Sequence, residues 1–357
     1  MEKKQALKKL CIWIAAELFL IALFVWVLDP FYQYHGPWFG LQQVLFDREN
    51  QVIGSIRNLS YDSVLLGSSE AENFDSTFLD EMYDCHALKV IRASGSTADL
   101  LYYLGKAHES QQLKRVFWCM DLFSLTTSTE VTVCSEYSPG YLFTETMLDD
   151  FTYLYNKDIL MKKIPLMLAY SVTGINTGGH AYDWSDGKDF SVKKAMEAYD
   201  KPDYVAESQP PEEYTAFVEQ NIALVKEEIS SHPEIEYIVF FPPYSLLWWD
   251  NTYVKGEGEK YFYVLEQILP TLLSFPNVSV YYFQADREIV CNLDNYMDQV
   301  HYSPVISQYM LDCIAAGEYR VTEENRDTVV EEMRDTYQYI IEDAIYRYYD
   351  NSSVMQE

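Results

Sequence analysis

The fold prediction starts from Tyr61-Asp-Ser-Val-Leu-Leu-Gly-Ser-Ser-Glu-Ala-Glu-Asn-Phe74, where an apolar run gives way to small polar residues. Ser63 to Leu66 contain a β-branched valine and indicate a short buried strand. The run stops at Gly67-Ser68-Ser69-Glu70, and a helix is predicted from Asp75 onward. Such an ending places a hydroxyl and free N–H groups at the carboxyl end of a sheet, where open α/β folds bind ligands. An ordinary strand-to-turn connection uses the same residue types, so both interpretations stay open on this segment alone.

Strands and helices alternate over much of the remaining chain. Four further apolar runs are predicted strands: Leu88–Ser96, Leu113–Phe123, Glu236–Ser245 and Val278–Phe283. Because segments of helical length separate them, we expect parallel strands joined by right-handed crossovers. The predicted class is therefore α/β with a central parallel sheet.

The N-terminus carries a candidate membrane anchor. Leu10 to Leu28 are nearly all apolar and follow a lysine-rich leader, a pattern typical of a helix that spans a bilayer with its N-terminus inside. A cleaved signal peptide is the alternative, but its apolar region would be shorter, and no small-residue cleavage site precedes Asp29-Pro30. We expect a single-pass protein of the cell membrane whose C-terminal domain is extracytoplasmic. Glu17 lies within the span, either protonated or snorkelling, or in contact with another membrane protein.

These patterns predict the following domain organisation. A cytoplasmic leader (1–9) and the transmembrane anchor (10–28) precede a connecting arm (29–59). An extracytoplasmic domain (60–320) follows, in which residues 124–209 interrupt the alternation and are expected to form a lid over the sheet. The last segment (321–357) contains apolar residues at helical spacing and predicts an amphipathic helix.

Charge and cysteine usage exclude several function classes. The chain has 26 basic and 55 acidic residues, a net charge of −29, which disfavours binding to nucleic acid or to the surface of anionic lipid. Any membrane attachment must therefore be hydrophobic. The six cysteines have no paired spacing, so they predict neither a disulfide framework nor a zinc site. No cofactor and no metal is predicted.

The segment Asp298-Gln-Val-His301 precedes a predicted helix that begins at Ser303 and Pro304. An aspartate three residues before a histidine can turn back to hold one imidazole nitrogen, which leaves the other free to act as base on a serine hydroxyl. A single D-x-x-H is weak by itself, because aspartates are frequent in an acidic chain. Together with Ser69, it completes the set of groups that a Ser-His-Asp triad requires.

The order of these blocks resembles that of the SGNH (GDSL-type) hydrolase family, with a nucleophilic serine after the first strand and a D-x-x-H near the C-terminus. The Gly-Ser-Ser-Glu form and the single anchor are similar to its membrane-bound branch, which includes the D-alanyl-transfer protein of teichoic acid D-alanylation. The resemblance covers residues 60–125 and 235–316. It implies a flavodoxin-like, three-layer α/β/α fold.

The resemblance also implies roles for individual residues. Ser69 would be the nucleophile, His301 the base and Asp298 the group that orients it. Ser94-Gly95 match the family's second block, where the Gly95 N–H would join the Ser69 N–H as an oxyanion donor.

This chain departs from the family pattern at the third block. The family has an oxyanion asparagine there, whereas the third predicted strand of this chain ends in Met120-Asp121-Leu122. A carboxylate donates no hydrogen bond unless it is protonated. Either another donor replaces the asparagine, or Asp121 has a structural role.

The function implied by the resemblance is O-acyl chemistry outside the cell membrane. A serine esterase or O-acyltransferase would act through an acyl-serine on a cell-envelope polysaccharide or teichoic acid. A membrane-bound O-acyltransferase is the implied partner, and Glu17 is one place for that contact. A hypothesis from a different class is a non-catalytic subunit that assembles or presents polymer, which the missing asparagine favours.

Overall fold

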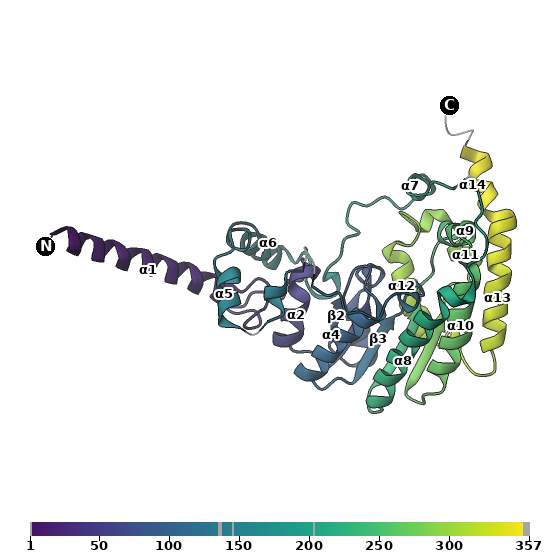
Figure 1. Cartoon of the computed structure of the whole chain (residues 1–357), viewed down its shortest axis with the longest axis horizontal. Coiled ribbons are helices and arrows are strands. Elements are labelled where there is room, and N and C mark those ends of the chain that lie inside the picture. The colour runs from purple at the N-terminus through teal and green to yellow at the C-terminus, as the bar shows by residue number, and fades with distance from the viewer. Residues whose placement is uncertain (1, 135–137, 145, 203, 353–357) are drawn as a thin grey trace. The chain divides into compact units, whose positions relative to one another are not determined.

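A computed structural model of the chain describes residues 2–134, 138–144, 146–202 and 204–352 (Figure 1). The chain forms two compact units. Unit 1 comprises Met1–Ser60 and Thr132–Tyr182, and unit 2 comprises Tyr61–Val131 and Asp183–Glu357. The middle of the predicted insertion thus belongs with the N-terminal segment, a grouping that differs from the predicted domain limits.

Unit 2 is a mixed α/β unit around one six-stranded sheet. Its strands are β1 (Ser63–Gly67), β2 (Ala87–Ile91), β3 (Arg115–Cys119), β4 (Glu236–Phe241), β5 (Val278–Tyr282) and β6 (Arg320–Val321). They lie in the order β2-β1-β3-β4-β5-β6. Each neighbouring pair is parallel except β5 and β6, which are antiparallel. The predicted α/β class with a central parallel sheet is confirmed, while the short antiparallel edge strand was not predicted.

Most strand residues are apolar, as expected where helices cover a sheet. Every residue of β1 and β2 is buried, as expected for parallel strands that have no solvent-facing side. One group of helices forms a row in which each helix packs on the next: α4 (Thr97–Ser110), α8 (Thr215–Ser231), α10 (Gly258–Leu273) and α13 (Arg326–Tyr339). A second group pairs α3 (Ser76–Tyr83) with α12 (Pro304–Ala316). The remaining helices of unit 2 are α7 (Val192–Glu197), α9 (Leu246–Val254), α11 (Arg287–Val290) and α14 (Ile345–Ser352).

The strand order fixes where a ligand site is expected. The chain first moves outward from β1 to β2, and then returns past β1 to β3 and continues in the other direction. In open α/β sheets this reversal opens a crevice at the carboxyl ends of the two strands that flank it. Ser69 follows β1 and Asp121 follows β3, so both lie at the switch point.

Unit 1 is built around the end of the N-terminal helix. It contains α1 (Glu2–Leu28), α2 (Arg48–Asn58), α5 (Met147–Leu154), a π-helical turn (Ile159–Lys163) and α6 (Ile164–Thr173). Helix α1 is long and apolar enough to cross a membrane. Its last turn enters a core whose buried members are Val25, Phe31, Ile53, Leu142, Tyr153, Ile159 and Ile164. Helix α1 and the segment 142–164 therefore share one hydrophobic core.

Candidate functional site

Ser69 stands in a short 3₁₀ turn, Ser69–Ala71, directly after β1. The Ser68 hydroxyl caps this turn by accepting a hydrogen bond from the Glu70 N–H. Gly67 lets the turn approach the sheet, because a Cβ at this position would lie 2.7 Å from the Ala71 Cβ and 3.0 Å from the Cys119 Cβ. The half-buried Ser69 side chain is thus held at the carboxyl end of β1.

Gly67→Ala is expected to displace this turn. The added methyl group meets Ala71 and Cys119 at rigid atoms, so Ser69 must move away from its partners. We expect a loss of about 1–3 kcal/mol in the free energy of unfolding. If Ser69 is the nucleophile that the resemblance implies, we also expect a fall of roughly 100-fold in the rate of its acylation. Gly105→Ala on α4 is the matched control, because a Cβ there meets no atom within 4 Å. If Gly67→Ala acylates as fast as Gly105→Ala, close packing beneath Ser69 is unimportant.

The structure brings Ser69, His301 and Asp298 together. The Ser69 Oγ lies 2.8 Å from the His301 Nε2, and the His301 Nδ1 lies 2.7 Å from the Asp298 Oδ2. The other oxygen of Asp298 accepts the backbone N–H groups of Val300 and His301 at 2.9 and 2.8 Å. Residues separated by more than 220 positions in the chain are thereby joined in one hydrogen-bonded series.

The electrostatics of Asp298 suit it to orient the histidine. Burial favours the neutral acid, but hydrogen bonds from His301 and from two backbone N–H groups outweigh it and lower the pKa of Asp298. An ionised Asp298 accepts a proton-bearing Nδ1, so the lone pair of Nε2 faces the Ser69 hydroxyl. A Ser-His-Asp triad requires this arrangement of tautomer and charge.

Trp184 is a site residue that the sequence analysis missed. Its indole Nε1 donates a hydrogen bond to the Ser69 carbonyl at 3.3 Å, and its ring meets the His301 ring edge-on at 5.3 Å. The Trp184 backbone N–H donates to the Asn73 side chain at 3.2 Å. The part of the predicted insertion that belongs to unit 2 therefore contributes an apolar wall beside the Ser69–His301 pair. Nothing in the sequence around Trp184 indicated that this tryptophan would contact Ser69 and His301.

The second block forms a tight turn after β2. Ser94 is exposed and has a left-handed backbone conformation with φ of 51°, while Gly95 is buried. The Gly95 N–H donates to the Arg92 carbonyl at 3.0 Å. In the structure, this predicted oxyanion donor is therefore already engaged within its own turn. The Ser69 N–H, in contrast, has no acceptor among the described residues.

Asp121 is buried at the end of β3. Its Oδ1 accepts the Tyr244 hydroxyl at 3.0 Å, whereas its Oδ2 has no hydrogen-bond partner of normal geometry among the described residues. Burial raises the pKa of Asp121 to about 6, although the nearby hydroxyls of Ser68 and Tyr244 lower it. Burial and the charges of Asp121 and Asp298 also raise the pKa of the neighbouring Glu70. Below about pH 6, Asp121 is thus a neutral acid that can donate a hydrogen bond.

The raised pKa of Asp121 predicts that this residue makes the folded state less stable as pH rises. Between the ordinary value of 3.8 and about 6, the folded state holds a proton that the unfolded state has lost. Stability due to this proton is complete below pH 3.8 and is lost as pH rises through about 6. Asp121→Asn removes the titration, so its free energy of unfolding relative to the parent is expected to rise by up to about 3 kcal/mol between pH 4 and pH 8.

Urea denaturation of the detergent-solubilised chain at both pH values checks this expectation. Asp312→Asn, on the exposed side of α12, is the control whose difference from the parent stays constant. A pH-independent difference for Asp121→Asn would show that the carboxyl group is not buried as described.

Among the described residues, one group of side chains could hold a metal ion: His108, Glu228 and His232. The Glu228 carboxylate lies 2.8 Å from the His108 Nε2 and 3.3 Å from the His232 Nδ1. The His232 Nδ1 also lies 3.0 Å from the Glu228 carbonyl. These hydrogen bonds join the ends of α4 and α8, and they account for the arrangement without a metal.

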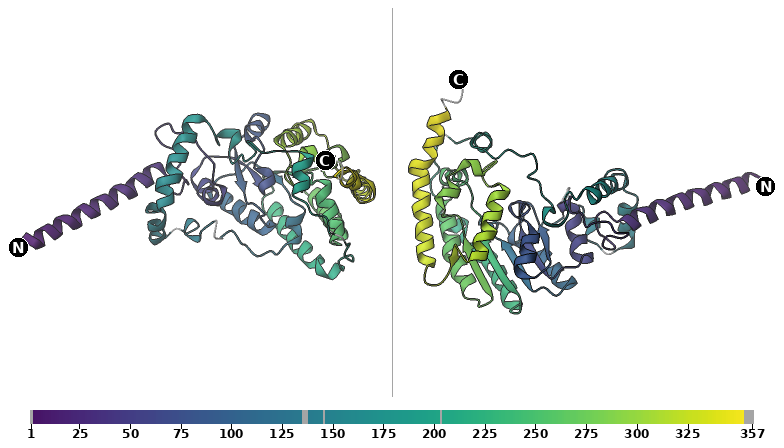
Figure 2. Two further views of the ribbon diagram at one scale, coloured as in Figure 1. Left: turned by 90° about the horizontal axis from the view of Figure 1, so that it is seen from above. Right: turned by 180° about the vertical axis from the view of Figure 1, so that it is seen from behind.

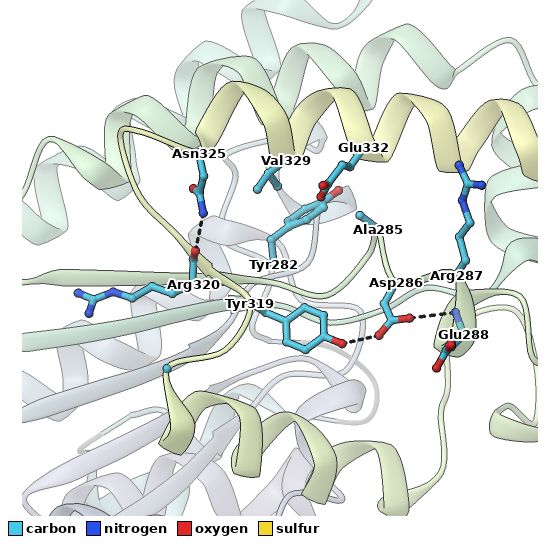
Figure 3. Close-up of a pocket in the computed structure, with 11 residues that line it drawn as sticks. Tyr282, Ala285, Asp286, Arg287, Glu288, Tyr319, Arg320, Asn325, Val329 and Glu332 are labelled. Atoms are coloured by element: carbon cyan, nitrogen blue, oxygen red, sulfur yellow. Dashed lines mark hydrogen bonds between the residues drawn. The ribbon is translucent and has the colours of Figure 1, made fainter.

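Two cavities of unit 2 lie away from Ser69 and His301. One of about 640 Å³ is open to solvent between β5, β6, α11 and α13 (Figure 3). On its wall the Tyr319 hydroxyl donates to Asp286 at 2.6 Å, and the Asn325 amide donates to the Arg320 carbonyl at 2.9 Å. A second cavity, of about 370 Å³, is lined by residues including Pro202, Val254 and Lys255. Neither cavity includes Ser69 or His301.

Comparison with protein-family models and with curated proteins identified no relative of this chain. The candidate site therefore depends on its own geometry, in which Ser69, His301 and Asp298 meet at the switch point of an α/β sheet.

Proposed function

We propose that the chain is a membrane-anchored, extracytoplasmic serine esterase or O-acyltransferase of the SGNH type. Its substrate class would be the O-acyl groups of a cell-envelope polysaccharide or teichoic acid. The observation that carries this proposal is the hydrogen-bonded series from the Ser69 hydroxyl through His301 to Asp298.

In the first half-reaction, Ser69 would attack an acyl ester. The Oγ forms a bond to the carbonyl carbon while His301 Nε2 takes the hydroxyl proton, and the imidazolium is stabilised by Asp298. The tetrahedral intermediate then collapses, the bond to the alcohol oxygen breaks, and His301 returns the proton to that oxygen. The product is an acyl-serine and a free alcohol.

In the second half-reaction, the acyl group would pass to water or to a hydroxyl of the acceptor. His301 removes a proton from the incoming hydroxyl, which attacks the acyl-serine, and the proton returns to Ser69 as its ester bond breaks. Hydrolysis and transfer use the same groups and differ in whether water reaches the acyl-serine. The indole of Trp184, in contact with both Ser69 and His301, is placed to limit that access.

The oxyanion would be stabilised by the Ser69 N–H and by one further donor. The Gly95 N–H would have to turn from the Arg92 carbonyl or share its proton between two acceptors. Asp121 would donate only in its neutral form. Stabilisation of the oxyanion is commonly worth about 10²–10³ in rate for each donor, so this part of the site limits catalysis most.

Membrane anchorage would keep the reaction beside the cell envelope. The apolar helix α1 lies at the N-terminal end of unit 1, and the lysines in its first turns favour an N-terminus inside the cell. We propose that a membrane-bound O-acyltransferase supplies the acyl group and that Glu17, within the span, lies at that contact. No role in nucleic acid binding is proposed, because the chain is strongly acidic.

A second candidate function is the presentation of polymer without catalysis. The engaged Gly95 N–H and the aspartate in place of the family asparagine favour it. In that case the Ser69–His301 pair would be a remnant of the fold, and the unit would hold polymer by its surface.

Incubation of the full chain with O-acetylated polysaccharide or D-alanylated teichoic acid distinguishes these functions. An enzyme releases acetate or D-alanine, or transfers it to an added acceptor, and Ser69→Ala abolishes the reaction. A presenting subunit binds the polymer equally with and without Ser69 and releases nothing.

A further inference from the structure

We propose that the helix formed by the π-helical turn Ile159–Lys163 and α6 lies on the outer surface of the membrane and buries its exposed apolar side in the lipid. This proposal depends on membrane anchorage by α1, and it is independent of the acyl chemistry at Ser69. The occupant of the surface is the lipid bilayer itself.

This helix is apolar on the side that faces solvent as well as on the side that faces the core. Its inner side buries Ile159, Ile164 and Met167. Its outer side carries Met161, Pro165, Ala169 and Val172, which are exposed and recur at the spacing of one helix face. Met161 is 64% exposed and Val172 is 83% exposed. An exposed apolar helix face of this kind is uncommon at a water-facing surface, so an apolar surface is expected to cover it.

The shared core places this helix next to the point where α1 would leave the bilayer. Val25, in the last turn of α1, lies in one buried cluster with Tyr153, Ile159 and Ile164. Figure 2 (left) shows α6 crossing the direction of α1 at the end of unit 1 from which α1 emerges. If α1 spans the membrane, α6 lies in the plane of the interface, as interfacial helices do.

Aromatic residues gather near the end of α1, at the same predicted boundary. Trp26 near the end of α1 meets His35 and Trp38 edge-on, and the His35 and Trp38 rings stack at 3.6 Å. Phe39 beside them is 81% exposed. Tryptophans and other aromatic residues gather at the level of lipid headgroups.

This helix also differs from the rest of the chain in its local charge, which is basic. Lys157, Lys162 and Lys163 fall within seven residues of a protein whose net charge is −29. Lys162 is paired with Asp158 at 2.9 Å and its side chain is largely exposed, whereas the less exposed Lys163 is paired with Asp47 at 2.5 Å. Lysines that flank an apolar helix face extend to the headgroups while their stems cover apolar surface. The local charge therefore does not oppose contact with lipid, as the overall charge would.

Photocrosslinking of the full chain tests the proposal. p-Benzoylphenylalanine replaces Met161 or Val172, and the protein is reconstituted in vesicles of phosphatidylethanolamine and phosphatidylglycerol, irradiated and examined by intact mass. Two control positions give the high and the low yield of lipid adducts against which positions 161 and 172 are compared. Phe19 on α1 should contact lipid, and Val305 on α12 is an equally apolar, 74% exposed residue of unit 2.

We expect lipid adducts at positions 161 and 172 in a yield close to that at Phe19 and several-fold above that at Val305. Adducts at Phe19 with none at 161 and 172 would overturn the proposal while leaving anchorage intact. No adduct at Phe19 would overturn anchorage and this proposal together, and neither result would bear on labelling of Ser69. In native membranes, a protein adduct at position 172 in place of lipid would show that a membrane protein covers the helix, which also overturns the proposal.

Discussion

His301→Ala is expected to slow acylation of Ser69 by about ten-thousand-fold or more. The Ser69 hydroxyl is a weak nucleophile, and the His301 Nε2 at 2.8 Å is its acceptor in the structure. Without that base, no side chain among the described residues accepts the proton of the Ser69 hydroxyl as Oγ bonds to the acyl carbon. The measurement is the rate of the p-nitrophenol burst from a p-nitrophenyl ester, which reports acylation whether the acyl group later goes to water or to a polymer.

Two further variants make this result specific. His86→Ala removes a histidine whose ring is largely exposed beside Asp80, and it should retain the parent burst. Because Ser69 and His301 act as one unit, the double variant Ser69→Ala/His301→Ala should be no slower than Ser69→Ala. A burst in His301→Ala within tenfold of the parent rate, about 1.4 kcal/mol in activation free energy, would contradict the role of His301.

Asp298→Asn is expected to reduce acylation by roughly ten-thousand-fold while the protein stays folded. The two backbone N–H groups of Val300 and His301 require an oxygen at Oδ1, so an asparagine would keep its oxygen there. Its amide NH₂ would then face the His301 Nδ1, which would have to become an acceptor. The proton would move to Nε2, and His301 could no longer accept the proton of Ser69.

Two other substitutions, Asp312→Asn and Asp298→Ala, serve as comparisons for Asp298→Asn. Asp312→Asn on α12 leaves the triad untouched and should acylate at the parent rate. Asp298→Ala loses the bonds to both backbone N–H groups as well as to His301, so it should also lower the free energy of unfolding, by about 1–3 kcal/mol. Equal burst rates in Asp298→Asn and the parent would mean that Asp298 does not set the tautomer of His301.

The sheet and the contact between Asp298 and His301 could be predicted because each carries a local signal. The run Ser63–Leu66 has strand character, and the small polar residues after it end the strand at Ser69. Asp298 and His301 are three positions apart, so their contact needs no knowledge of the fold. The contact between Ser69 and His301 could not be read from a local pattern, because 232 positions of the chain separate the two residues.

Other features depend on contacts that no local pattern reveals. Residues 132–182 were expected to be part of one insertion, 124–209, whereas the structure groups them with the N-terminal segment in unit 1. The Asp29 carboxylate accepts the Tyr153 hydroxyl at 2.7 Å and the Tyr34 N–H at 2.7 Å, so a buried polar contact links the end of α1 to α5. Contacts of this kind pair one residue with a partner more than a hundred positions away, and helical periodicity carries no record of them.

The oxyanion groups were the least predictable part of the site. The family pattern assigned the Gly95 N–H by position, but its acceptor depends on the turn that Ser94 makes in the left-handed region. For Asp121, burial was not evident from the sequence, and burial is what shifts its pKa and gives it a neutral form near pH 6. Burial and backbone angles are tertiary properties, so both features needed the structure.

The most direct test of the central claim is the intact mass of the full chain after treatment with a fluorophosphonate. Such a reagent bonds only to an activated serine hydroxyl. We predict one adduct on the parent, located at Ser69 by peptide mapping, and none on Ser69→Ala or His301→Ala. A folded parent that gains no adduct, or an adduct that persists in Ser69→Ala, would contradict the assignment of Ser69, His301 and Asp298 as a working triad.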